Sequence, residues 1–334
     1  ILVTGGAGFI GSHTCISLLE NNYRLVVIDS YANSSQLNLD VIRELLDNEY
    51  SDLSDRFFIF NGDIRDEKFL QDIFEKFKRM EKSIYAVIHF AGLKAVNESI
   101  SKPLEYWSVN VGGALSLLKI MNQYNCFQIV FSSSASVYDN FFEGILDEKA
   151  TLNPKNPYGR NKLTIENILN DLYTSQPDLW KIAILRYFNP IGSHPSGKIG
   201  ELPKKDISNL FPLISQVASG KRDKLQIYGN DWPTIDGTGI RDFIHVMDLA
   251  DAHVASLNYL ISNIPNIISI NIGTGRGTSI LEIMKIFSNL GYSDLKIVFS
   301  KKRLGDHCYV VADNKKALEL LNWTPKRNIV DMCK

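Results

Sequence analysis

The run ILVTGGAGFIG (residues 1–11) decides the fold of this chain. An apolar run ends at Thr4, glycines follow at positions 5, 6, 8 and 11, and an apolar helical pattern begins after them. Glycines at this spacing allow a tight turn, close approach of the backbone to a pyrophosphate, and tight packing of helix on strand. The N-terminus of the following helix offers free N–H groups to the phosphates. The run therefore predicts a dinucleotide-binding turn with contacts at Gly5, Gly8, Phe9, Ile10 and Gly11.

The remainder of the first half alternates short apolar runs with longer amphipathic segments. Nearly continuous apolar strands separated by helices are typical of a parallel sheet covered on both faces. The sequence therefore predicts an α/β fold with a doubly wound parallel sheet of the Rossmann type. The expected strands are Ile1–Thr4, Leu25–Asp29, Phe57–Asn61, Ala86–Phe90, Ile129–Ser132 and Ile182–Arg186, and the expected helices are Phe9–Glu20, Leu37–Asp47, Lys68–Lys78, Leu104–Tyr124 and Tyr158–Tyr173.

This alternation ends after Arg186. The segment Asn189–Lys205 is rich in Gly, Pro, Ser and Lys and predicts a loop. We expect an NAD-binding domain at residues 1–186 and a smaller α/β substrate-binding lobe at residues 187–334, with some segments of the lobe returning to the first domain. Shorter elements of the lobe are expected at Leu210–Ser219, Leu225–Tyr228, Val246–Ile261 and Ile280–Leu290.

Two carboxylates at expected strand ends bear on the cofactor. Asp29 ends the second strand, 18 residues after Gly11, where a carboxylate accepts hydrogen bonds from the adenosine ribose hydroxyls. The same charge repels a 2′-phosphate, so the sequence favours NAD over NADP. Asp63 ends the third strand and either binds the adenine amino group or forms the N-cap of a helix ahead of Glu67.

Tyr158 and Lys162 lie four residues apart at the start of a predicted helix and share one of its faces. A tyrosine with its ordinary pKa of about 10 is a poor base at neutral pH. A nearby ammonium and the positive nicotinamide ring favour the phenolate, so we expect a lowered pKa that lets Tyr158 accept a sugar hydroxyl proton. Ser134, at the end of the fifth strand, is expected to bridge substrate and tyrosine, with turn capping as the alternative role.

The composition limits the other function classes. The formal net charge of −1 provides no basic footprint for nucleic acid. The six histidines lack metal-ligand spacing, so we expect no metal site. No run approaches 18 apolar residues, so we expect no membrane segment. The four cysteines are far apart in sequence and are expected to be free thiols in a reducing cytoplasm.

The glycine turn, Ser134 and the Tyr158/Lys162 pair resemble the extended short-chain dehydrogenase/reductase family. Over essentially its whole length the chain is similar to the UDP-glucose 4-epimerases, through HFAGLKAV (89–96), LRYFNP (185–190), DGTGIRDFIHV (236–246) and RLGD (303–306). The resemblance implies an NAD-dependent isomerase with UDP-glucose and UDP-galactose as its substrates. In the mechanism that we expect, Tyr158 takes the 4-hydroxyl proton while C4 is oxidised. The 4-keto sugar then turns over and is reduced on its opposite face.

The resemblance also implies a role for individual residues. Arg241 and Arg303 are expected to neutralise the diphosphate, because guanidinium groups are the usual partners of phosphate oxygens; without the resemblance both are solvated surface charges. The implied NAD contacts are Gly5, Gly8, Phe9, Ile10, Gly11, Asp29, Ser30, Asn33, Ser34, Asp63, Ile64, Phe90, Ala91, Lys94, Tyr158, Lys162, Tyr187 and Phe188. The implied substrate contacts are Ser134, Ala135, Ser136, Tyr187, Phe188, Asn189, Asn209, Leu210, Gln226, Ile227, Tyr228, Arg241, Arg303, Asp306 and Val310.

The chain departs from the family pattern at a few positions. Val109 stands where an asparagine near NAD is usual, Asn97 and Asp139 replace usual glycines, and Phe243 replaces a usual tyrosine. None of these changes removes the catalytic set. Val310 stands where a large tyrosine closes the sugar pocket in part of the family. We therefore expect the N-acetylated UDP-sugars to be accepted too, unless Val310 is simply an apolar strand residue.

Two alternative functions remain. A nucleotide-sugar 4,6-dehydratase of the same fold is expected to carry Asp-Glu after the catalytic Ser or Thr, whereas this chain has Ala135 and Ser136. A non-catalytic NAD-sensing protein is expected to lose the Tyr/Lys pair or the substrate arginines, and this chain keeps all four. The resemblance further implies a homodimer that pairs through the helices near Leu104–Tyr124 and Tyr158–Tyr173.

Overall fold

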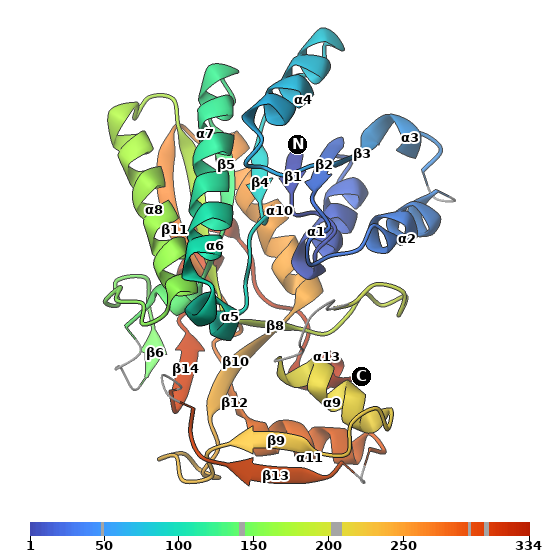
Figure 1. The fold of residues 1–334 in the computed structure, drawn as a ribbon, viewed down its shortest axis with the longest axis vertical. Helices are drawn as coiled ribbons and strands as arrows, with labels where there is room; N and C mark the ends of the chain where they lie inside the picture. Colours follow the sequence, from blue (N-terminus) through green and yellow to red (C-terminus); the bar gives the residue numbers. More distant parts are fainter. Residues whose placement is uncertain (48–49, 140–143, 202–208, 293–294, 304–306) are drawn as a thin grey trace.

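The structure is a computed structural model that describes residues 1–334 except 48–49, 140–143, 202–208, 293–294 and 304–306. Its larger part is a seven-stranded parallel sheet in the order β11-β7-β5-β4-β1-β2-β3 (Figure 1). The predicted α/β fold with a Rossmann-type parallel sheet is therefore confirmed. The strands are β1 (Leu2–Thr4), β2 (Leu25–Asp29), β3 (Phe57–Asn61), β4 (Val87–His89), β5 (Gln128–Ser134), β7 (Lys181–Tyr187) and β11 (Asn266–Ile272).

Helices cover both faces of this sheet, because side chains of both faces are apolar. On one face Val3, Val27 and Ile88 pack with helices α1 (Phe9–Glu20), α2 (Leu37–Leu46), α10 (Val246–Ser262) and α12 (Lys315–Leu321). On the other face Leu2, Val26 and Val87 pack with α4 (Glu67–Arg79), α7 (Gly113–Gln123) and α8 (Pro157–Ser175). The alternation along β1, β2 and β4 therefore builds two separate apolar layers, with α3 (Leu53–Arg56) at the edge beside β3.

One long helix was expected at Leu104–Tyr124, and the structure corrects this prediction. The segment consists of α6 (Pro103–Tyr106), the π-helical turn η1 (Trp107–Gly112) and α7, and it is preceded by α5 (Val96–Ser101). A π-helical turn inserts one extra residue into the helix and so changes the direction of the side chains around it. Here the carboxamide of Asn110 faces the backbone of Leu93, with which it exchanges hydrogen bonds of 2.7 and 3.1 Å.

The smaller lobe lies below the large sheet in Figure 1. Its strands form a five-stranded sheet, in which β8 (Asn189–Ile191) pairs with β10 (Ile240–His245), and a parallel pair. The predicted loop at Asn189–Lys205 is therefore wrong at its start, because pairing with a strand some 50 residues away cannot be read from a local Gly/Pro-rich composition. The other strands are β6 (Ile145–Leu146), β12 (Gly277–Ser279), β14 (Tyr309–Ala312), β9 (Leu225–Tyr228) and β13 (Ile297–Ser300), and the helices are α9 (Leu210–Ala218), α11 (Ile280–Asn289) and α13 (Ile329–Cys333).

The order of the strands positions the site. The chain leaves β1 for β2 and β3 on one side and returns to β4, β5 and β7 on the other, so the order reverses between β1 and β4. Ligands of open α/β sheets bind outside the carboxyl ends of the strands at such a reversal. Within the part of the chain that the structure describes, no helix is long and apolar enough to cross a membrane.

Candidate active site

A cleft of about 360 Å³ opens at the reversal between β1 and β4. Its wall on one side is the glycine turn after β1, and on the other it is the start of α8. Residues from β8 and α9 of the smaller lobe close the remaining side. The cleft therefore brings together segments that are distant in sequence, at the place where the fold predicts a nucleotide.

The glycine turn has no room for larger residues. Gly5 has a φ of +72°, and a Cβ on Gly11 would lie 2.3 Å from the carbonyl oxygen of Gly5. Helix α1, which the structure describes in full, begins at Phe9 without a side-chain cap and without an acidic residue in its first turn. Its N-terminus thus presents uncapped backbone N–H groups and a positive dipole end to the cleft, which suits a pyrophosphate.

Asp29 is buried at the end of β2 and anchors this turn. Its carboxylate accepts hydrogen bonds from the backbone N–H of Ala7 at 2.9 Å, from the N–H of Tyr31 at 2.9 Å and from the hydroxyl of Ser34 at 2.7 Å. These three bonds point the carboxylate into the cleft. A carboxylate has about four lone-pair sites, so capacity for a ribose hydroxyl remains.

Asp63 also lines the cleft, and one of its two expected roles is wrong. The N-cap of α4 is Asp66, whose side chain accepts the N–H of Phe69. Asp63 instead pairs with Arg65 at 2.6 Å, and this ion pair lowers the pKa of its carboxyl group. The carboxylate therefore stays charged at the end of β3.

Tyr158, Lys162 and Ser134 come together as expected from their spacing. Tyr158 and Lys162 lie on consecutive turns of α8 and are both buried. The Lys162 ammonium donates to the carbonyl of Ser132 at 2.6 Å and lies 5.9 Å from the centroid of the Tyr158 ring. The side chain of Ser134 lowers the pKa of Tyr158. Ser134 also caps a short 3₁₀ turn by accepting the N–H of Ser136 at 3.1 Å, so its alternative capping role is present as well.

Burial dominates the electrostatics of this trio. Burial raises the pKa of Tyr158 above its ordinary value, and the side chain of Ser134 offsets this only in part. Burial also lowers the pKa of Lys162 to about 8, against an opposing effect of Glu166. The predicted lowering depends on Lys162 together with the nicotinamide of bound NAD, so a lowered pKa of Tyr158 stays a prediction for the NAD-bound protein.

The cleft gathers the residues expected to contact NAD. All of them line it, including the distant pair Tyr187 and Phe188. The gathered residues are Gly5, Gly8, Phe9, Ile10, Gly11, Asp29, Ser30, Asn33, Ser34, Asp63, Ile64, Phe90, Ala91, Lys94, Tyr158, Lys162, Tyr187 and Phe188. Of the residues expected to contact the substrate, Ser134, Tyr187, Phe188, Asn189, Asn209 and Leu210 line it as well.

The other expected substrate contacts lie outside this lining. Ala135 and Ser136 form the turn after Ser134. Gln226, Ile227 and Tyr228 belong to β9, and the guanidinium of Arg303 lies over the Tyr228 ring at 3.6 Å from its centroid. Arg241 on β10 is the register partner of Val310 on β14. Asp306 lies outside the described residues.

Two residues at or near the cleft, Glu201 and Asn110, were not expected from the sequence. Glu201 accepts hydrogen bonds from Lys94 at 2.7 Å and from Asn209 at 2.8 Å, and no sequence pattern connects groups so far apart. Asn110 holds the loop that carries Lys94, through the backbone of Leu93. Its position beside the departure at Val109 was the one signal available, and Val109 itself lines the cleft.

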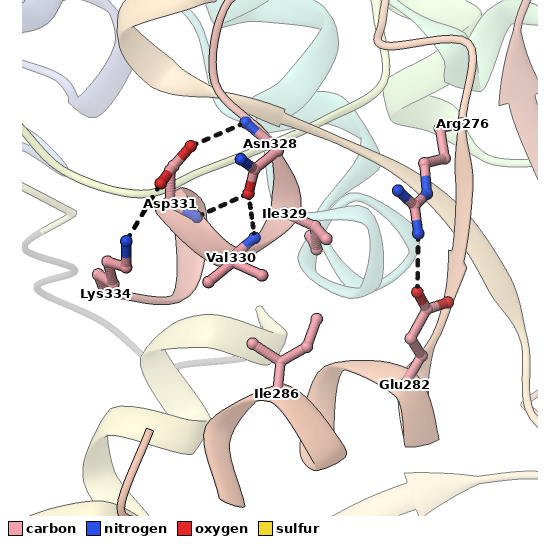
Figure 2. Close-up of a pocket in the computed structure, with 8 residues that line it drawn as sticks. All are labelled: Arg276, Glu282, Ile286, Asn328, Ile329, Val330, Asp331 and Lys334. Carbon is pink, nitrogen blue, oxygen red and sulfur yellow. Dashed lines mark hydrogen bonds and ion pairs between the residues drawn. The ribbon is translucent and has the colours of Figure 1, made fainter. Parts of the chain in front are cut away.

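A second hollow lies on the smaller lobe between α11 and α13, and none of the expected site residues lines it (Figure 2). Its polar side chains bond one another: Arg276 pairs with Glu282 at 3.2 Å, and Asn328 and Asp331 cap the start of α13. Lys334 pairs with Asp331 at 3.4 Å. These groups stabilise the lobe and do not converge on a common point in the hollow.

Known proteins match the chain over its full length. The family model described as GDP-mannose 4,6 dehydratase matches residues 2–334. UDP-glucose 4-epimerase 2 of Arabidopsis thaliana is 46% identical over 334 residues, which cover 100% of this chain and 93% of that protein. UDP-glucose 4-epimerase of Bacillus subtilis is 44% identical over 333 residues, with coverage of 100% and 94%. The crystal structure of UDP-glucose 4-epimerase from Bifidobacterium longum in complex with NAD+ and UDP has a TM-score of 0.91 and 41% identity, and covers 99% of this chain and 95% of that chain.

Proposed function

The chain belongs to the UDP-glucose 4-epimerase family of extended short-chain dehydrogenases/reductases, and on this premise we propose how its cleft interconverts UDP-galactose and UDP-glucose. The activity is an NAD-dependent isomerisation at C4 of the sugar. The observation that carries the residue assignment is the cleft itself, which unites the glycine turn, Asp29 and the Tyr158/Lys162/Ser134 trio. We assign residues 1–186 mainly to NAD and residues 187–334 mainly to the UDP-sugar.

The residues at the carboxyl end of β1 and β2 fit NAD. The uncapped start of α1 receives the pyrophosphate, and the glycines keep the backbone close to it. Asp29 receives the ribose hydroxyls and repels a 2′-phosphate. When bound, NAD supplies a reversible acceptor for the hydrogen at C4, so the sugar passes through a 4-keto form and the cofactor is regenerated in each turnover.

Tyr158 holds and returns the proton of the 4-hydroxyl. Because burial raises its pKa, the phenolate requires the positive charge of Lys162 and of the oxidised nicotinamide beside it. Ser134 lines the cleft with Tyr158 and lowers its pKa, so the two hydroxyls are suited to share the substrate hydroxyl. The trio therefore acts as the general acid–base group, a role worth about 10²–10⁴ in rate.

The smaller lobe holds the UDP moiety. Arg241 and Arg303 neutralise the diphosphate, and Gln226 to Tyr228 flank the uracil. Tight binding of UDP with loose binding of the sugar lets the 4-keto sugar turn over and present its other face. The rival elimination chemistry of a 4,6-dehydratase requires carboxyl groups after Ser134, whereas the chain has Ala135 and Ser136 in a 3₁₀ turn there.

Redox balance tests the proposal. The purified protein is expected to convert UDP-galactose to UDP-glucose without added NAD and to release about one dinucleotide per chain on denaturation, because each cycle regenerates the cofactor. A preparation that requires stoichiometric NAD and accumulates NADH contradicts the proposal and identifies a dehydrogenase.

Val310 carries a proposal on substrate breadth. It is a partly buried residue of β14 beside Arg241, and valine is much smaller than tyrosine. We expect UDP-N-acetylglucosamine and UDP-N-acetylgalactosamine to be interconverted by the wild type and excluded by Val310→Tyr, while both variants retain the UDP-glucose pair. A wild type that ignores the acetamido sugars, or a tyrosine variant that handles both pairs equally, contradicts this assignment.

The assembly that we propose is a homodimer that pairs through α6, η1 and α7 together with α8, with α5 next to them in the chain. The apolar side chains exposed on these elements include Ile100, Leu104 and Leu115, and Leu104 is 82% exposed. Exposed apolar clusters of this kind usually mark a surface that a partner covers. Light scattering is expected to give twice the chain mass for the wild type and one chain mass for Leu104→Glu.

We place the enzyme in the cytoplasm, a reducing compartment, because Cys15, Cys126 and Cys333 are buried free thiols.

A further inference from the structure

We propose that Glu166, together with Arg186, is a positioning residue of the reaction: it holds the end of β5 against α8 and supplies the negative charge that keeps Lys162 an ammonium. The proposal rests on the proposed function and deepens it, because it names the group that controls the proton chemistry at Tyr158. Neither residue lines the cleft.

Glu166 continues the catalytic face of α8. Tyr158, Lys162 and Glu166 follow at intervals of four residues, so they lie on consecutive turns of one helix face. All three side chains are buried, and Glu166 is only 2% exposed. The face therefore presents an acid–base group, a cation and an anion in this order along the helix.

The carboxylate of Glu166 joins α8 to two strands. It accepts the hydroxyl of Ser133 on β5, and it accepts both Nε, at 3.1 and 3.2 Å, and Nη2, at 2.6 Å, of Arg186 on β7. Ser133 and Arg186 are register partners in the sheet. One residue further, the same strands carry Ser134 and Tyr187 into the cleft, on the opposite side of the sheet by strand alternation. A shift at Glu166 therefore moves the strand ends that face the substrate.

The guanidinium of Arg186 is also hydrogen-bonded by groups other than Glu166. Its Nη1 donates to the Tyr138 hydroxyl at 3.2 Å and to the carbonyl of Glu148 at 3.3 Å, and Tyr138 donates to Asn271 on β11 at 2.6 Å. A buried ion pair is a weak source of stability, since apolar replacements of the same size are often neutral or stabilising. A fully bonded pair directly behind the active site is therefore better explained by what it does for the neighbouring groups.

The charge of Glu166 acts on Lys162. Burial lowers the pKa of Lys162 to about 8, and Glu166 raises it in opposition. Without the carboxylate, Lys162 loses this opposing effect and gives up its proton more readily, while the Arg186 guanidinium is left without its anionic partner. The other ionisable groups packed around Lys162 and Tyr158 are His89 on β4, Tyr187 on β7, and Tyr106 on α6 with its hydrogen-bonded Glu98. Burial keeps His89, Tyr106 and Tyr187 neutral at pH 7, so none of these three replaces Glu166.

The test compares Glu166→Gln, Ser133→Ala and the double variant Glu166→Gln/Arg186→Met in the NAD-loaded protein. Glu166→Gln is expected to lower kcat for UDP-galactose about tenfold or more at neutral pH, with an unchanged KM. It is also expected to move the alkaline limb of the kcat profile down by about one pH unit or more. The limb of the double variant lies between those of Glu166→Gln and wild type, because both charges are gone. Ser133→Ala keeps the charge and leaves the limb in place.

A titration without turnover separates this proposal from the assigned activity. The phenolate of Tyr158 is followed by ultraviolet difference absorbance, with Tyr158→Phe as the blank, and Glu166→Gln is expected to raise the pH at which it forms. A folded Glu166→Gln protein with the wild-type titration and pH profile overturns the proposal, and so does a Ser133→Ala variant that shifts both equally. If Glu166→Gln does not fold, the double variant provides the test. The proposal is wrong if the alkaline limb and the Tyr158 titration of the double variant lie at the same pH as in wild type.

Discussion

The two ends of the molecule approach their nucleotides in different ways. At the Rossmann end, a continuous turn of backbone between β1 and α1 forms the site. Asp29 is bonded to that turn through the N–H of Ala7 and to the segment after β2 through Tyr31 and Ser34. At the UDP end, the expected contacts come from β9, β10, β14 and the segment at Arg303, and most of them lie outside the lining of the central cleft. The first site is built mainly of main chain, whereas the contacts proposed for UDP are mainly side chains.

This difference has a physical origin and a functional consequence. Backbone N–H groups in a tight glycine turn have little conformational freedom, so they form a rigid binding site for a cofactor that stays bound through every turnover. Long side chains such as Arg303 carry more rotamer freedom and order only when they find a partner. A substrate that enters and leaves, and whose sugar turns over in between, requires the second kind of site. The catalytic trio lies at the border between the two.

Removing the acid–base group at this border is expected to have the largest effect. Tyr158→Phe keeps the ring but loses the proton acceptor, so kcat falls by about 10²–10⁴ while NAD content and the KM for UDP-galactose stay near normal. Steady-state kinetics and cofactor extraction measure this. Tyr173→Phe, on the same helix, is the matched control and retains wild-type turnover. A Tyr158→Phe enzyme with near-normal kcat shows that the catalytic assignment is wrong.

The second largest effect is expected from a substitution that disrupts the glycine turn after β1. Gly11→Ala places a Cβ 2.3 Å from the Gly5 carbonyl oxygen, and neither backbone can yield without opening the turn. Overpacking of this kind costs about 1–3 kcal/mol, which corresponds to roughly 5- to 150-fold in NAD affinity. Gly112→Ala is the control, because Gly112 is not in the lining of the cleft and a Cβ there would lie 3.9 Å from its nearest neighbour, the carbonyl oxygen of Trp107. If the two purified variants contain equal amounts of NAD, the result contradicts a pyrophosphate site built from the backbone of this turn.

Acid is expected to act on buried histidines, three of which pack at the Rossmann end; a fourth, His245 on β10, also has its pKa lowered to about 4 by burial. Burial lowers the pKa of His13 and of His253 to about 4 and that of His89 to about 3. Above pH 6.5 these rings are neutral in both the folded and the unfolded chain and contribute nothing to the pH dependence. Below it the unfolded chain binds the protons first, so each ring lowers the free energy of unfolding by about 1.4 kcal/mol per pH unit until its folded pKa is reached.

Urea unfolding between pH 7 and pH 4.5 measures this slope. His253→Gln removes one of the three rings and is expected to flatten the slope by about one proton, although it loses the ring contacts with Phe90 and Tyr187 at every pH. A slope that is identical in wild type and variant excludes His253 as a source of acid sensitivity.

The smallest effect is expected at the UDP end. Arg303→Met removes one charge-assisted contact to the diphosphate and is expected to raise the KM for UDP-galactose about tenfold with little change in kcat. Lys302→Met is the matched control, because this neighbouring cation lies over the Trp232 ring at 4.5 Å and has no assigned phosphate. Equal KM changes in the two variants show a general charge effect and contradict the specific role of Arg303.

Sequence reasoning predicted the Rossmann end nearly completely. Its strands, its glycine turn and the Tyr158/Lys162 spacing are local patterns, and local patterns determine which residues turn, which alternate and which share a helix face. The further NAD contacts, such as Lys94 and Phe188, were implied by the family resemblance, and they line the same cleft. The same reasoning failed where contacts join distant segments: β8 was expected to be a loop, and Glu201 at Lys94 was not expected at all.

The chain alone therefore determined the fold class, the kind of cofactor and the identity of the acid–base pair. Only the tertiary structure decided which groups surround that pair, and hence its protonation. Burial raises the pKa of Tyr158, which the spacing of Tyr158 and Lys162 does not reveal, and the register of β5 against β7 brings Ser133 and Arg186 to Glu166. Desolvation and charge pairing depend on the distances between groups and on the exclusion of water, and neither is fixed until the distant strands have packed together.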